Sequence, residues 1–474
     1  MAFTDLQSFV ALLEKEGELK RVTEEVDAEL EVTEIATRAV KENLPALLFE
    51  NVKGSKYPLV INSMASIRRI ELALGRPAEA LGEDIVRFME DVNPPSLGSF
   101  WRNRKTGWRL LKIRPKHTRR ALSQQVSEEP QLDDLPILKC WPEDGGRFFT
   151  LPLVISRDPR TGAGNMGMYR MQVYDQRTTG MHMQIQKGGG FHYQLAEKAG
   201  KPLEMAVAVG GDPSLILAAI MPLPEGLDEL AFSGIVRGQR TPLAKAKTVD
   251  LKVPSHAEFV FEGIVMPGVR RLEGPFGDHF GHYSAAGDHP VFEMTRVTRR
   301  KNAIYPATVV GVPPQEDRYL GDATQLALTP LMRLVRHEVK DMWAYYEAGF
   351  HNLLVVSVDS RYQREAIKTA LGILGDGQLS LTKNLVLVGP DVNPRNYSEV
   401  LQAIRRNFDP AQDFHLIART AADTLDFTGE ALHKGSKMIL DATGGSGGEG
   451  TPPAIALPAN IGAIAPGIVK HRLV

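Results

Sequence analysis

Leu353-Leu354-Val355-Val356-Ser357-Val358 is a nearly unbroken apolar run, and it decides the fold class of the C-terminal third of the chain. Such a run is typical of a strand that is buried on both faces inside a parallel sheet. The spacing of apolar residues predicts helices over 331–348, 364–374 and 398–407, and a second buried strand over 385–388. Strands that alternate with helices indicate an α/β unit with a parallel sheet.

Residues 135–315 carry a different pattern, in which short apolar runs are separated by Gly and Pro. Only one helix is clear in this region, and it begins after Asp212-Pro213-Ser214. Many short strands at this spacing predict an antiparallel barrel or sandwich. The candidate strands cover residues 151–156, 168–174, 205–209, 249–253, 259–263, 291–297 and 304–310.

The first 115 residues mix helices with short strands and predict a small α/β domain. Thr4 and Gln7 have the spacing of a helix capping box, and Gly17 is placed to end that helix. A second helix is expected over 31–43. Further predicted features are strands over 46–51 and 59–62 and a polar surface crossing over 123–134.

Composition places the chain among ordinary globular proteins. Its 474 residues suffice for roughly two to four domains, and the formal net charge of −1 gives no reason to expect a nucleic-acid partner. Cys140 is the only cysteine, which excludes a disulfide framework and a thiolate metal cluster. The charged N-terminus is unlike a signal peptide, and no apolar run has membrane-spanning length. These features predict a cytoplasmic protein without a transmembrane segment.

Gly162-Ala163-Gly164-Asn165-Met166-Gly167 matches the dinucleotide fingerprint G-x-G-x-x-G. That fingerprint requires a helix directly after the glycines, so that the pyrophosphate can lie at the helix N-terminus. The residues that follow, Met168-Tyr169-Arg170-Met171-Gln172-Val173-Tyr174, have the pattern of a strand instead. We therefore reject a dinucleotide-binding fold.

The stretch Glu273-Gly274-Pro275-Phe276-Gly277-Asp278-His279-Phe280-Gly281-His282-Tyr283-Ser284 concentrates the side chains suited to chemistry. Its proline and glycines predict a folded loop that could bring Glu273 and Asp278 round one point. When two carboxylates lie in unlike surroundings, their pKa values can differ enough that one is protonated while the other is charged. The alternative is a glycine-rich turn whose acids are solvated.

A second polar set is spread over the region rich in predicted strands. Asn165, His182 and Glu229 offer oxygen and imidazole ligands, which suit Mn²⁺ or Mg²⁺ better than a thiophilic ion. Lys187 and the glycines at 188–190 could accept a phosphate through the ammonium and the backbone N–H groups. Taken singly, each of these residues is more often structural than functional.

Read together, these segments resemble the UbiD family of reversible decarboxylases. The resemblance covers nearly the whole chain, and its runs stand in the family's order. They are residues 12–21, 45–51, 140–144, 165–170, 273–279 and 435–443. It implies an α/β (α+β) fold of three domains: an N-terminal α/β domain (1–115), a split β-barrel like that of flavin reductases (116–318), and a C-terminal α/β domain with an extended tail (319–474).

The resemblance also implies prenylated FMN as cofactor, supplied by a partner flavin prenyltransferase, with Mn²⁺ (or Mg²⁺) and often K⁺ at its phosphate. The implied metal ligands are Asn165, His182 and Glu229. In the ubiquinone-pathway branch an Arg stands in place of His182. The implied cofactor contacts are Met168, Tyr169, Arg170, Met183, Gln184, Lys187, Gly188 and Lys437.

Arg170, Glu273 and Asp278 match the family's catalytic Arg–Glu–acid network. Loss of CO₂ from an sp² carbon leaves a carbanion that no side chain can delocalise, so an organic cofactor must supply the electron sink. Arg170 is expected to hold the substrate carboxylate and Glu273 to pair with Arg170. Asp278, its pKa raised by an apolar pocket, is expected to protonate the carbon.

The expected substrate is a hydroxyaryl acid of quinone biosynthesis, of the 4-hydroxy-3-polyprenylbenzoate type. A dihydroxynaphthoate or another aromatic, heteroaromatic or acrylic acid is the alternative within the family, whose members form dimers and hexamers. Two further hypotheses stay open. One is a Mn²⁺-dependent hydrolase that uses Asp278 and His282 and lacks a flavin spectrum; the other is a non-catalytic flavin binder, in which Glu273 and Asp278 can be replaced without effect.

Overall fold

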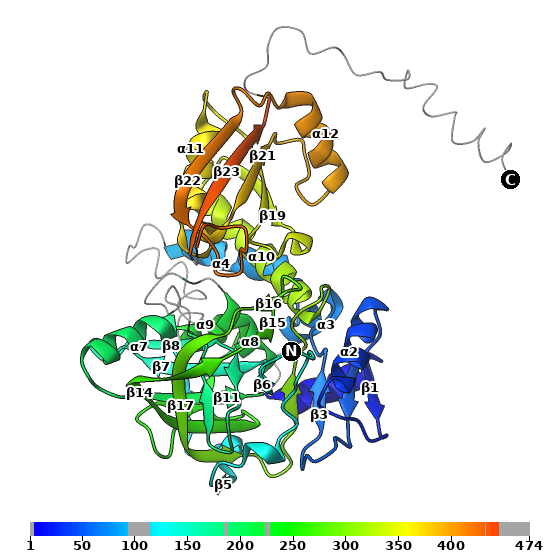
Figure 1. Cartoon of the computed structure of the whole chain (residues 1–474). Coiled ribbons are helices and arrows are strands. Elements are labelled where there is room, and N and C mark those ends of the chain that lie inside the picture. Colours follow the sequence, from blue (N-terminus) through cyan, green and yellow to red (C-terminus); the bar gives the residue numbers. More distant parts are fainter. Residues whose placement is uncertain are drawn as a thin grey trace, which may run out of the picture.

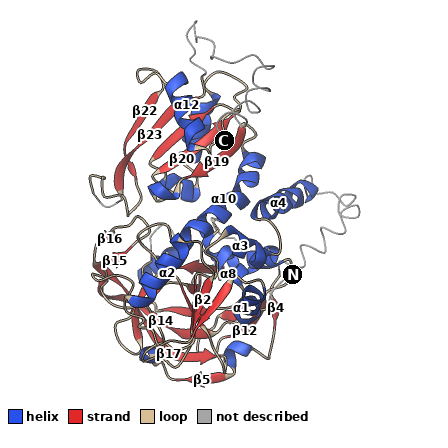
Figure 2. Cartoon of the chain, turned by 90° about the vertical axis from the view of Figure 1, so that its right-hand side faces the viewer, coloured by secondary structure: helices blue, strands red, loops and turns tan. Residues whose placement is uncertain are grey.

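Three units follow one another along the chain (Figure 1). The N-terminal and central units lie side by side, and the C-terminal unit is joined to them through the long helix α10 (Glu316–Val335) (Figures 1 and 2). The computed structural model describes residues 4–92, 114–183, 188–221, 223, 228–431 and 433–444.

Helix α1 (Leu6–Lys15) opens the N-terminal unit with a capping box different from the predicted one. Asp5, not Thr4, is the N-cap: its carboxylate accepts the Ser8 amide at 2.8 Å, and the Asp5 amide donates back to Ser8 Oγ at 3.2 Å. The Thr4–Gln7 prediction was wrong by one position. Asp5 also binds Arg300 at 2.9 Å, a long-range contact that the local spacing could not reveal.

The N-terminal sheet borrows a strand from a distant part of the sequence. Its order is β1-β2-β3-β18, and β18 (Tyr305–Ala307) pairs with β3 in parallel. The predicted strand over 304–310 therefore leaves the central unit and joins the N-terminal one. The other elements of this unit are β1 (Leu19–Val22), α2 (Glu31–Lys41), β2 (Ala46–Phe49), β3 (Leu59–Ile61), α3 (Ile67–Leu74) and α4 (Ala78–Val92).

The central unit is built on an antiparallel sheet in the order β10-β17-β14-β11-β7-β8, with β5 added beside β17. Among the described residues its end strands do not pair, so the barrel is split rather than closed. The strands are β5 (Val126–Glu128), β7 (Pro152–Arg157), β8 (Gly164–Met168), β10 (Thr178–Gly180), β11 (Leu203–Val209), β14 (Phe259–Glu273) and β17 (Gly287–Arg299).

Short strands and helices complete this unit, and two of the helices were not predicted. Helix α8 starts after Asp212 as expected, because Asp212 accepts the Ser214 amide at 2.8 Å. The unpredicted helices are α7 (Gly188–Lys198) and α9 (Glu229–Arg237). The remaining elements are β4 (Lys116–His117), β6 (Phe148–Phe149), β9 (Met171–Gln172), α8 (Pro213–Ile220), β12 (Pro242–Lys245), β13 (Lys252–Pro254), β15 (Phe276–Gly277) and β16 (Tyr283–Ser284).

The glycine run at 162–167 does not open a helix. It leads into β8, which pairs antiparallel with β7, so the dinucleotide fingerprint was rightly rejected. The strand predicted over 168–174 is wrong in its bounds. β8 ends at Met168, Tyr169 and Arg170 form a break, and β9 starts at Met171. That break matters because it turns Arg170 out of the sheet ladder.

The C-terminal unit is α/β, but its sheet is mixed. In the order β19-β20-β21-β23-β22, the strands β20, β21 and β23 run parallel, as the apolar runs predicted. The edge strands β19 and β22 are antiparallel to their neighbours. The elements are β19 (Val339–Ala344), β20 (Leu353–Val358), α11 (Glu365–Leu374), β21 (Asn384–Val388), α12 (Tyr397–Asn407), β22 (Phe414–Ala421) and β23 (Lys434–Ala442).

The helix predicted over 331–348 was wrong. Helix α10 begins earlier, at Glu316, and ends at Val335, and the chain then forms the edge strand β19. Val339 and Met342 turn into the core of the C-terminal unit while Lys340 points to solvent. Tertiary pairing with β20 therefore overrides the helical propensity of this segment.

Phe261 in β14 is 1 % exposed, and its ring packs edge-on against Phe149 with centroids 5.4 Å apart. Phe261→Ala should lower the free energy of unfolding by about 3–5 kcal/mol, because it leaves a cavity in the core. The matched control is Phe414→Ala on the edge strand β22, where the side chain is 42 % exposed and the expected loss is below about 0.5 kcal/mol. Chemical denaturation of both variants measures the difference, and equal losses would contradict this account of the core.

Candidate active site

The loop between β14 and β17 folds back on itself and carries the candidate acids. Its ends are held by the pairing of Glu273 with Gly287, and β15 pairs with β16 inside it. The Asp278 amide donates to the His282 carbonyl at 2.9 Å, which closes the tip. The loop lies at the top of the central unit, below α10 and the C-terminal unit (Figure 1).

Arg170 contacts both acids of this loop. Its Nε donates to Glu273 Oε1 at 2.9 Å, and one terminal nitrogen donates to Asp278 Oδ2 at 2.6 Å. The other terminal nitrogen reaches Ser284 Oγ at 3.0 Å, and the guanidinium lies 4.6 Å from the centre of the Phe276 ring. The three residues predicted as the catalytic network thus form one contiguous cluster.

Glu273 is fully buried, with a side-chain exposure of 0 %. Burial alone would raise the pKa of its carboxyl, but the hydrogen bond with His182 and the charge of Arg170 outweigh it and lower the pKa to about 2. Glu273 is therefore a permanent anion at neutral pH. Its role in this geometry is to hold and orient Arg170.

Asp278 does not have the raised pKa that was expected from the sequence. Burial pushes its pKa upward, but the hydrogen bond and charge of His279, together with the charge of Arg170, lower it below the ordinary value. The His279 ring Nδ1 lies 2.8 Å from Asp278 Oδ1, whereas Arg170 binds the other carboxylate oxygen. The apolar pocket that was expected around this acid is in fact a charged one.

His182 turns its ring toward Glu273, with Nδ1 2.9 Å from Oε2. His289 from β17 lies beside it: the two ring centroids are 4.3 Å apart, and His289 Nε2 is 3.4 Å from the same oxygen. Burial and the neighbouring His182 lower the pKa of His289 to about 4, so this imidazole is neutral at neutral pH. The two rings are about one-fifth exposed.

The remaining predicted ligands gather around the start of α7. Asn165 is buried, and its amide nitrogen lies 3.4 Å from the Tyr169 hydroxyl, which accepts the Gly189 amide at 3.1 Å. A Cβ on Gly188 would lie 1.9 Å from Asn165 Oδ1, so only glycine fits there. Asn165, Tyr169 and Gly188 thus lie together, whereas Gln184 and Lys187 lie outside the described residues.

Glu229, the first residue of α9, reaches this cluster from the other side. Its Oε2 accepts the Met166 amide at 2.8 Å, and burial raises the pKa of its carboxyl. Of the two predicted methionine contacts, Met168 is the last residue of β8 and Met183 is buried. Lys437 lies in β23 of the C-terminal unit. Its ammonium donates to the Ser380 and Thr382 carbonyls of the same unit.

The donor set can be tested for a metal. Asn165 precedes Met166, and Glu229 accepts the Met166 amide, so both residues offer oxygen atoms near this position. Oxygen ligands suit a hard cation. His182, Glu273 and His289 form a second group, with ligand atoms within 4.8 Å of one another. Glu273 is already neutralised by Arg170, so a cation in that second group would be repelled by the guanidinium. The chemistry therefore favours the oxygen ligands near α7, with His182 turned to the Arg170 cluster.

Three participants in this cluster were not predicted: Ser284, Phe276 and His289. The first two stand in the loop over 273–284, but nothing in their spacing ties them to Arg170. His289 follows the loop, and only the hairpin register, which places Arg271 opposite His289, brings it back beside Glu273. Antiparallel pairing of the two strands that flank the loop was the signal that could have found it.

Residues 140–145 support the loop from below. The Trp141 indole donates to the Val310 carbonyl at 2.6 Å, and Asp144 accepts the Gly277 amide at 2.8 Å. Gln172 bridges the two segments, because its amide group donates to the Gly145 carbonyl at 2.6 Å and accepts the Gly274 amide at 2.7 Å. The loop position is thus set by several directed hydrogen bonds.

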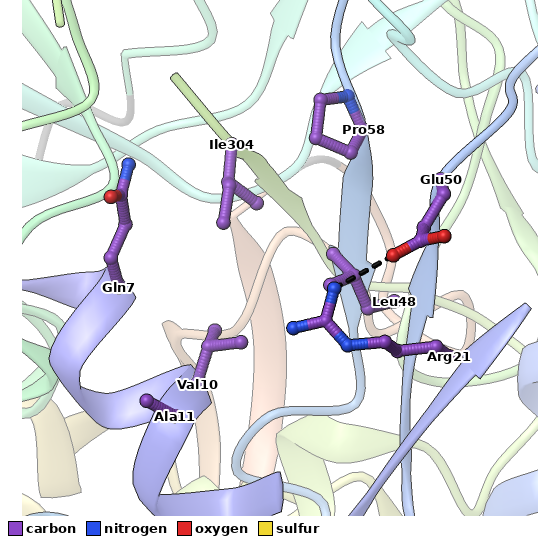
Figure 3. A pocket seen from close by; sticks show the side chains of 8 residues that line it. All are labelled: Gln7, Val10, Ala11, Arg21, Leu48, Glu50, Pro58 and Ile304. Atoms are coloured by element: carbon purple, nitrogen blue, oxygen red, sulfur yellow. Dashed lines mark hydrogen bonds and ion pairs between the residues drawn. The ribbon is translucent and has the colours of Figure 1, made fainter. Parts of the chain in front are cut away.

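A separate pocket of about 380 Å³ opens in the N-terminal unit between α1 and the sheet (Figure 3). Its lining contains none of the predicted site residues that the structure describes. The arginine on its wall, Arg21, is already paired with Glu50 at 2.7 Å and with Glu14 at 2.6 Å. We therefore place the chemistry at the Arg170 cluster and not in this pocket.

Comparison with known proteins identifies the family of the chain. Models of the N-terminal, Rift-related central and C-terminal domains of 3-octaprenyl-4-hydroxybenzoate carboxy-lyase match residues 10–89, 114–313 and 318–442. A protein of Chlamydia pneumoniae that is named as a subunit of 4-hydroxybenzoate decarboxylase is 41 % identical over 440 residues, covering 93 % of this chain and 75 % of its own.

The chain belongs to the UbiD family.

Solved structures extend this result to the fold. Vanillic acid decarboxylase of Sedimentibacter hydroxybenzoicus in its closed form has a TM-score of 0.86 at 27 % identity, covering 100 % of this chain and 99 % of its own. The UbiD-class enzyme HmfF of Pelotomaculum thermopropionicum, in complex with FMN, has a TM-score of 0.79 at 28 % identity, covering 96 % and 97 %.

Membership in the UbiD family makes this chain a (de)carboxylase, and its structural neighbour from Sedimentibacter hydroxybenzoicus is a decarboxylase of vanillic acid, an aromatic acid. Neighbours of the same class bind FMN or prenylated FMN. Among the described helices, none is both long enough and apolar enough to span a bilayer.

A substitution at Gly277 tests how rigidly Trp141 supports the loop between β14 and β17. A Cβ at this position would lie 2.1 Å from Trp141 Cδ1, and the indole cannot retreat because it is bonded to Val310. Gly277→Ala should displace the loop and cost about 1–3 kcal/mol of stability. Gly389→Ala is the control, since its nearest atom, the Thr443 carbonyl oxygen, would be 3.6 Å away. Thermal unfolding compares the two, and equal melting temperatures would argue against a rigid support.

Proposed function

We propose that this protein is a prenylated-FMN-dependent decarboxylase of a hydroxylated aromatic acid. The observation that carries the proposal is the contact of Arg170 with both Glu273 and Asp278 at 2.9 and 2.6 Å. Decarboxylation needs a cation that binds the substrate carboxylate and an acid that delivers a proton to the carbon. Arg170 and Asp278 are side chains of these two kinds, and they are in contact.

The cofactor would lie along the β8–α7 side of the site. When bound, it supplies the electron sink for the carbon that loses CO₂. The glycines that start α7 lie at a helix N-terminus, whose backbone N–H groups favour a phosphate. Asn165 and Glu229 would hold Mn²⁺ or Mg²⁺ beside it, with K⁺ as a second ion, and His182, Met168, Tyr169, Met183, Gln184, Lys187, Gly188 and Lys437 remain the proposed further contacts.

The side chains around Arg170 would then divide the work. Arg170 binds and orients the substrate carboxylate, and the buried anion Glu273 fixes the guanidinium in place. Asp278 stands on the opposite nitrogen of Arg170 and delivers the proton that replaces CO₂ on the carbon. His182 and His289, each with one ring nitrogen directed at Glu273, are placed to contact polar groups of an aromatic ring.

The names of the relatives support a phenolic substrate. Both 4-hydroxybenzoate and vanillic acid are hydroxylated benzoic acids. We propose a 4-hydroxy-3-polyprenylbenzoate-type acid of quinone biosynthesis first, and a dihydroxynaphthoate or another aromatic or heteroaromatic acid second. A cytoplasmic homodimer or homohexamer, which receives its cofactor from a flavin prenyltransferase, completes the proposal.

The metal-dependent hydrolase is less well supported by the geometry. It required Asp278 and His282 to act together, but the ring of His282 packs edge-on against Phe427, with centroids 5.7 Å apart. His282 meets Asp278 through its backbone carbonyl, which accepts the Asp278 amide. We therefore keep the decarboxylase as the single proposed function.

The deciding experiment is co-expression with a flavin prenyltransferase, followed by CO₂-release assays on a panel of aromatic acids. The purified protein should show a flavin-type absorbance spectrum and release CO₂ from at least one hydroxylated benzoate or naphthoate. Protein that binds the cofactor but decarboxylates no acid on the panel would contradict the proposed activity. Protein without a flavin spectrum after co-expression would contradict the proposed cofactor.

Asp278→Asn should lower kcat by about 10²–10⁴-fold, the usual contribution of a general acid, while the cofactor spectrum stays unchanged. The amide keeps the size of the side chain and can still contact Arg170. Turnover of the reconstituted variant, measured by CO₂ release, tests this role. Near-normal turnover would show that Asp278 is not the acid.

Arg170→Ala should abolish decarboxylation and also substrate-dependent deuterium exchange, because Arg170 binds the substrate carboxylate in the first reaction and holds Asp278, the proposed proton donor, in both. The control is Arg157→Ala, which removes a surface ion pair with Asp250 in the same unit. Exchange measured by mass spectrometry in D₂O distinguishes the two variants. Undiminished exchange in Arg170→Ala would reject the assignment.

A further inference from the structure

His279 lies against Asp278, and its hydrogen bond and charge are the main reasons that the pKa of Asp278 is lowered. A carboxyl with a low pKa carries no proton at neutral pH, so by itself it is a poor general acid. Its neighbour His279 touches the same carboxylate twice, through ring Nδ1 and through the backbone amide, each 2.8 Å from Asp278 Oδ1. The imidazole is therefore in position to pass a proton to Asp278.

Acids from three elements surround this imidazole. Asp278 belongs to its own loop, Asp317 lies in the first turn of α10, and Asp423 lies between β22 and β23 of the C-terminal unit. Burial lowers the pKa of His279, but the three carboxylates outweigh it and raise the pKa above its ordinary value. The other charged groups packed here are Arg170, which binds Asp278, and His351, which is hydrogen-bonded to Asp423.

The C-terminal unit also contacts the loop on both sides of His279. A Cβ on Gly349 would lie 2.8 Å from the Phe280 ring, so that ring occupies the space over the glycine. On the other side, His282 packs against Phe427. Asp423 can therefore face His279 only while the C-terminal unit is docked on this loop.

We propose that His279, bonded to Asp278 through its ring and its backbone amide, is a positioning residue for the reaction, which supplies through Asp278 the proton that replaces CO₂. This inference rests on the proposed decarboxylase function. It makes proton supply depend on a residue of the C-terminal unit, although the acid itself belongs to the central unit.

The proton balance is complete. The bond between the substrate carbon and its carboxylate breaks and releases CO₂, and the carbon takes the proton from Asp278. Asp278 in turn receives the Nδ1 proton of His279, and the neutral imidazole is reprotonated by solvent, to which its side chain is 26 % exposed. The net reaction consumes one proton from water for each CO₂ released.

The sign of the pH dependence follows from this order. The His279 imidazole carries its proton below its pKa and loses it as the pH rises through that pKa. Loss of either neighbouring acid lowers that pKa, so the alkaline fall in kcat should begin at a lower pH. Loss of the imidazole removes the more basic group of the pair and also raises the pKa of Asp278, which loses the hydrogen bond and charge of His279. The carboxyl is then the remaining proton source, so activity should fall at a lower pH than in the wild type.

Four variants of the reconstituted holoenzyme test the inference. His279→Asn keeps a donor near Asp278 but cannot titrate, and should lower kcat at neutral pH by about 10²-fold, with the loss shrinking as the pH falls. Asp423→Asn and Asp317→Asn should keep the acid plateau of kcat and shift the alkaline fall to lower pH. Asp426→Asn is the matched control for Asp423, since Asp426 pairs with Lys383 instead, and its profile should be that of the wild type.

A direct titration separates this inference from the proposed function. In protein labelled at the histidine ring carbons, the signal that is missing in His279→Asn reports the His279 pKa by NMR without any turnover. The His279 pKa should lie above that of an ordinary histidine in the wild type and fall in Asp423→Asn and Asp317→Asn. An unchanged His279 titration in both acid variants, or a wild-type pH profile in His279→Asn, would overturn the inference.

Discussion

The buried ion pair of Arg170 and Glu273 is the interaction on which the site depends. Glu273 has no exposure to solvent, and an unpaired carboxylate there would be strongly destabilising. The guanidinium offsets this cost only because its fork is aligned, with nitrogens 2.9 and 3.4 Å from the two carboxylate oxygens. That alignment leaves the remaining nitrogen of Arg170 for Asp278, so the buried anion Glu273 also fixes the position of the acid that we propose as the proton donor.

The sheet and the loop supply this alignment from opposite directions. Arg170 is free to point at the loop because β8 ends at Met168 and β9 begins only at Met171. The loop is held in register by the hairpin of β14 with β17 and by Gln172, which bonds both to Gly145 and to Gly274. Rigid support of this kind is needed because a shift of about 1 Å at a reacting group can cost orders of magnitude in rate. The candidate catalytic acids lie in a loop, but the strands fix the position of that loop.

The sequence predicted the fold well where signals are local, and the site only in part. Apolar runs identified β20 and β21, and the Asp212 cap identified α8, because neighbours in sequence determine these elements. Strand β19 was mistaken for helix and β18 for a strand of the central unit, because partners distant in the chain decide both. The acids and Arg170 could be named from the family resemblance, whereas His289 and the partners of His279 come together only through tertiary folding. The expected sign of the Asp278 pKa failed because burial was counted without the hydrogen bond and charge of the adjacent His279 and the charge of the distant Arg170.

A perturbed pKa does not by itself locate the chemistry in this protein. Glu258 is buried, and burial raises its pKa to about 7, a value suited to a general acid, yet its carboxylate is engaged by Gln7, Arg300 and the Ile304 amide. These contacts make it a joint between the N-terminal helix and the central sheet. Asp278 has the opposite pKa shift, but it stands between a cation and an imidazole that remain in partial contact with solvent. Proton transfer depends on the contacts along which a proton can move as well as on the pKa of the acid. The loop at Asp278 provides His279 as donor, Asp278 as acceptor, and contact with water.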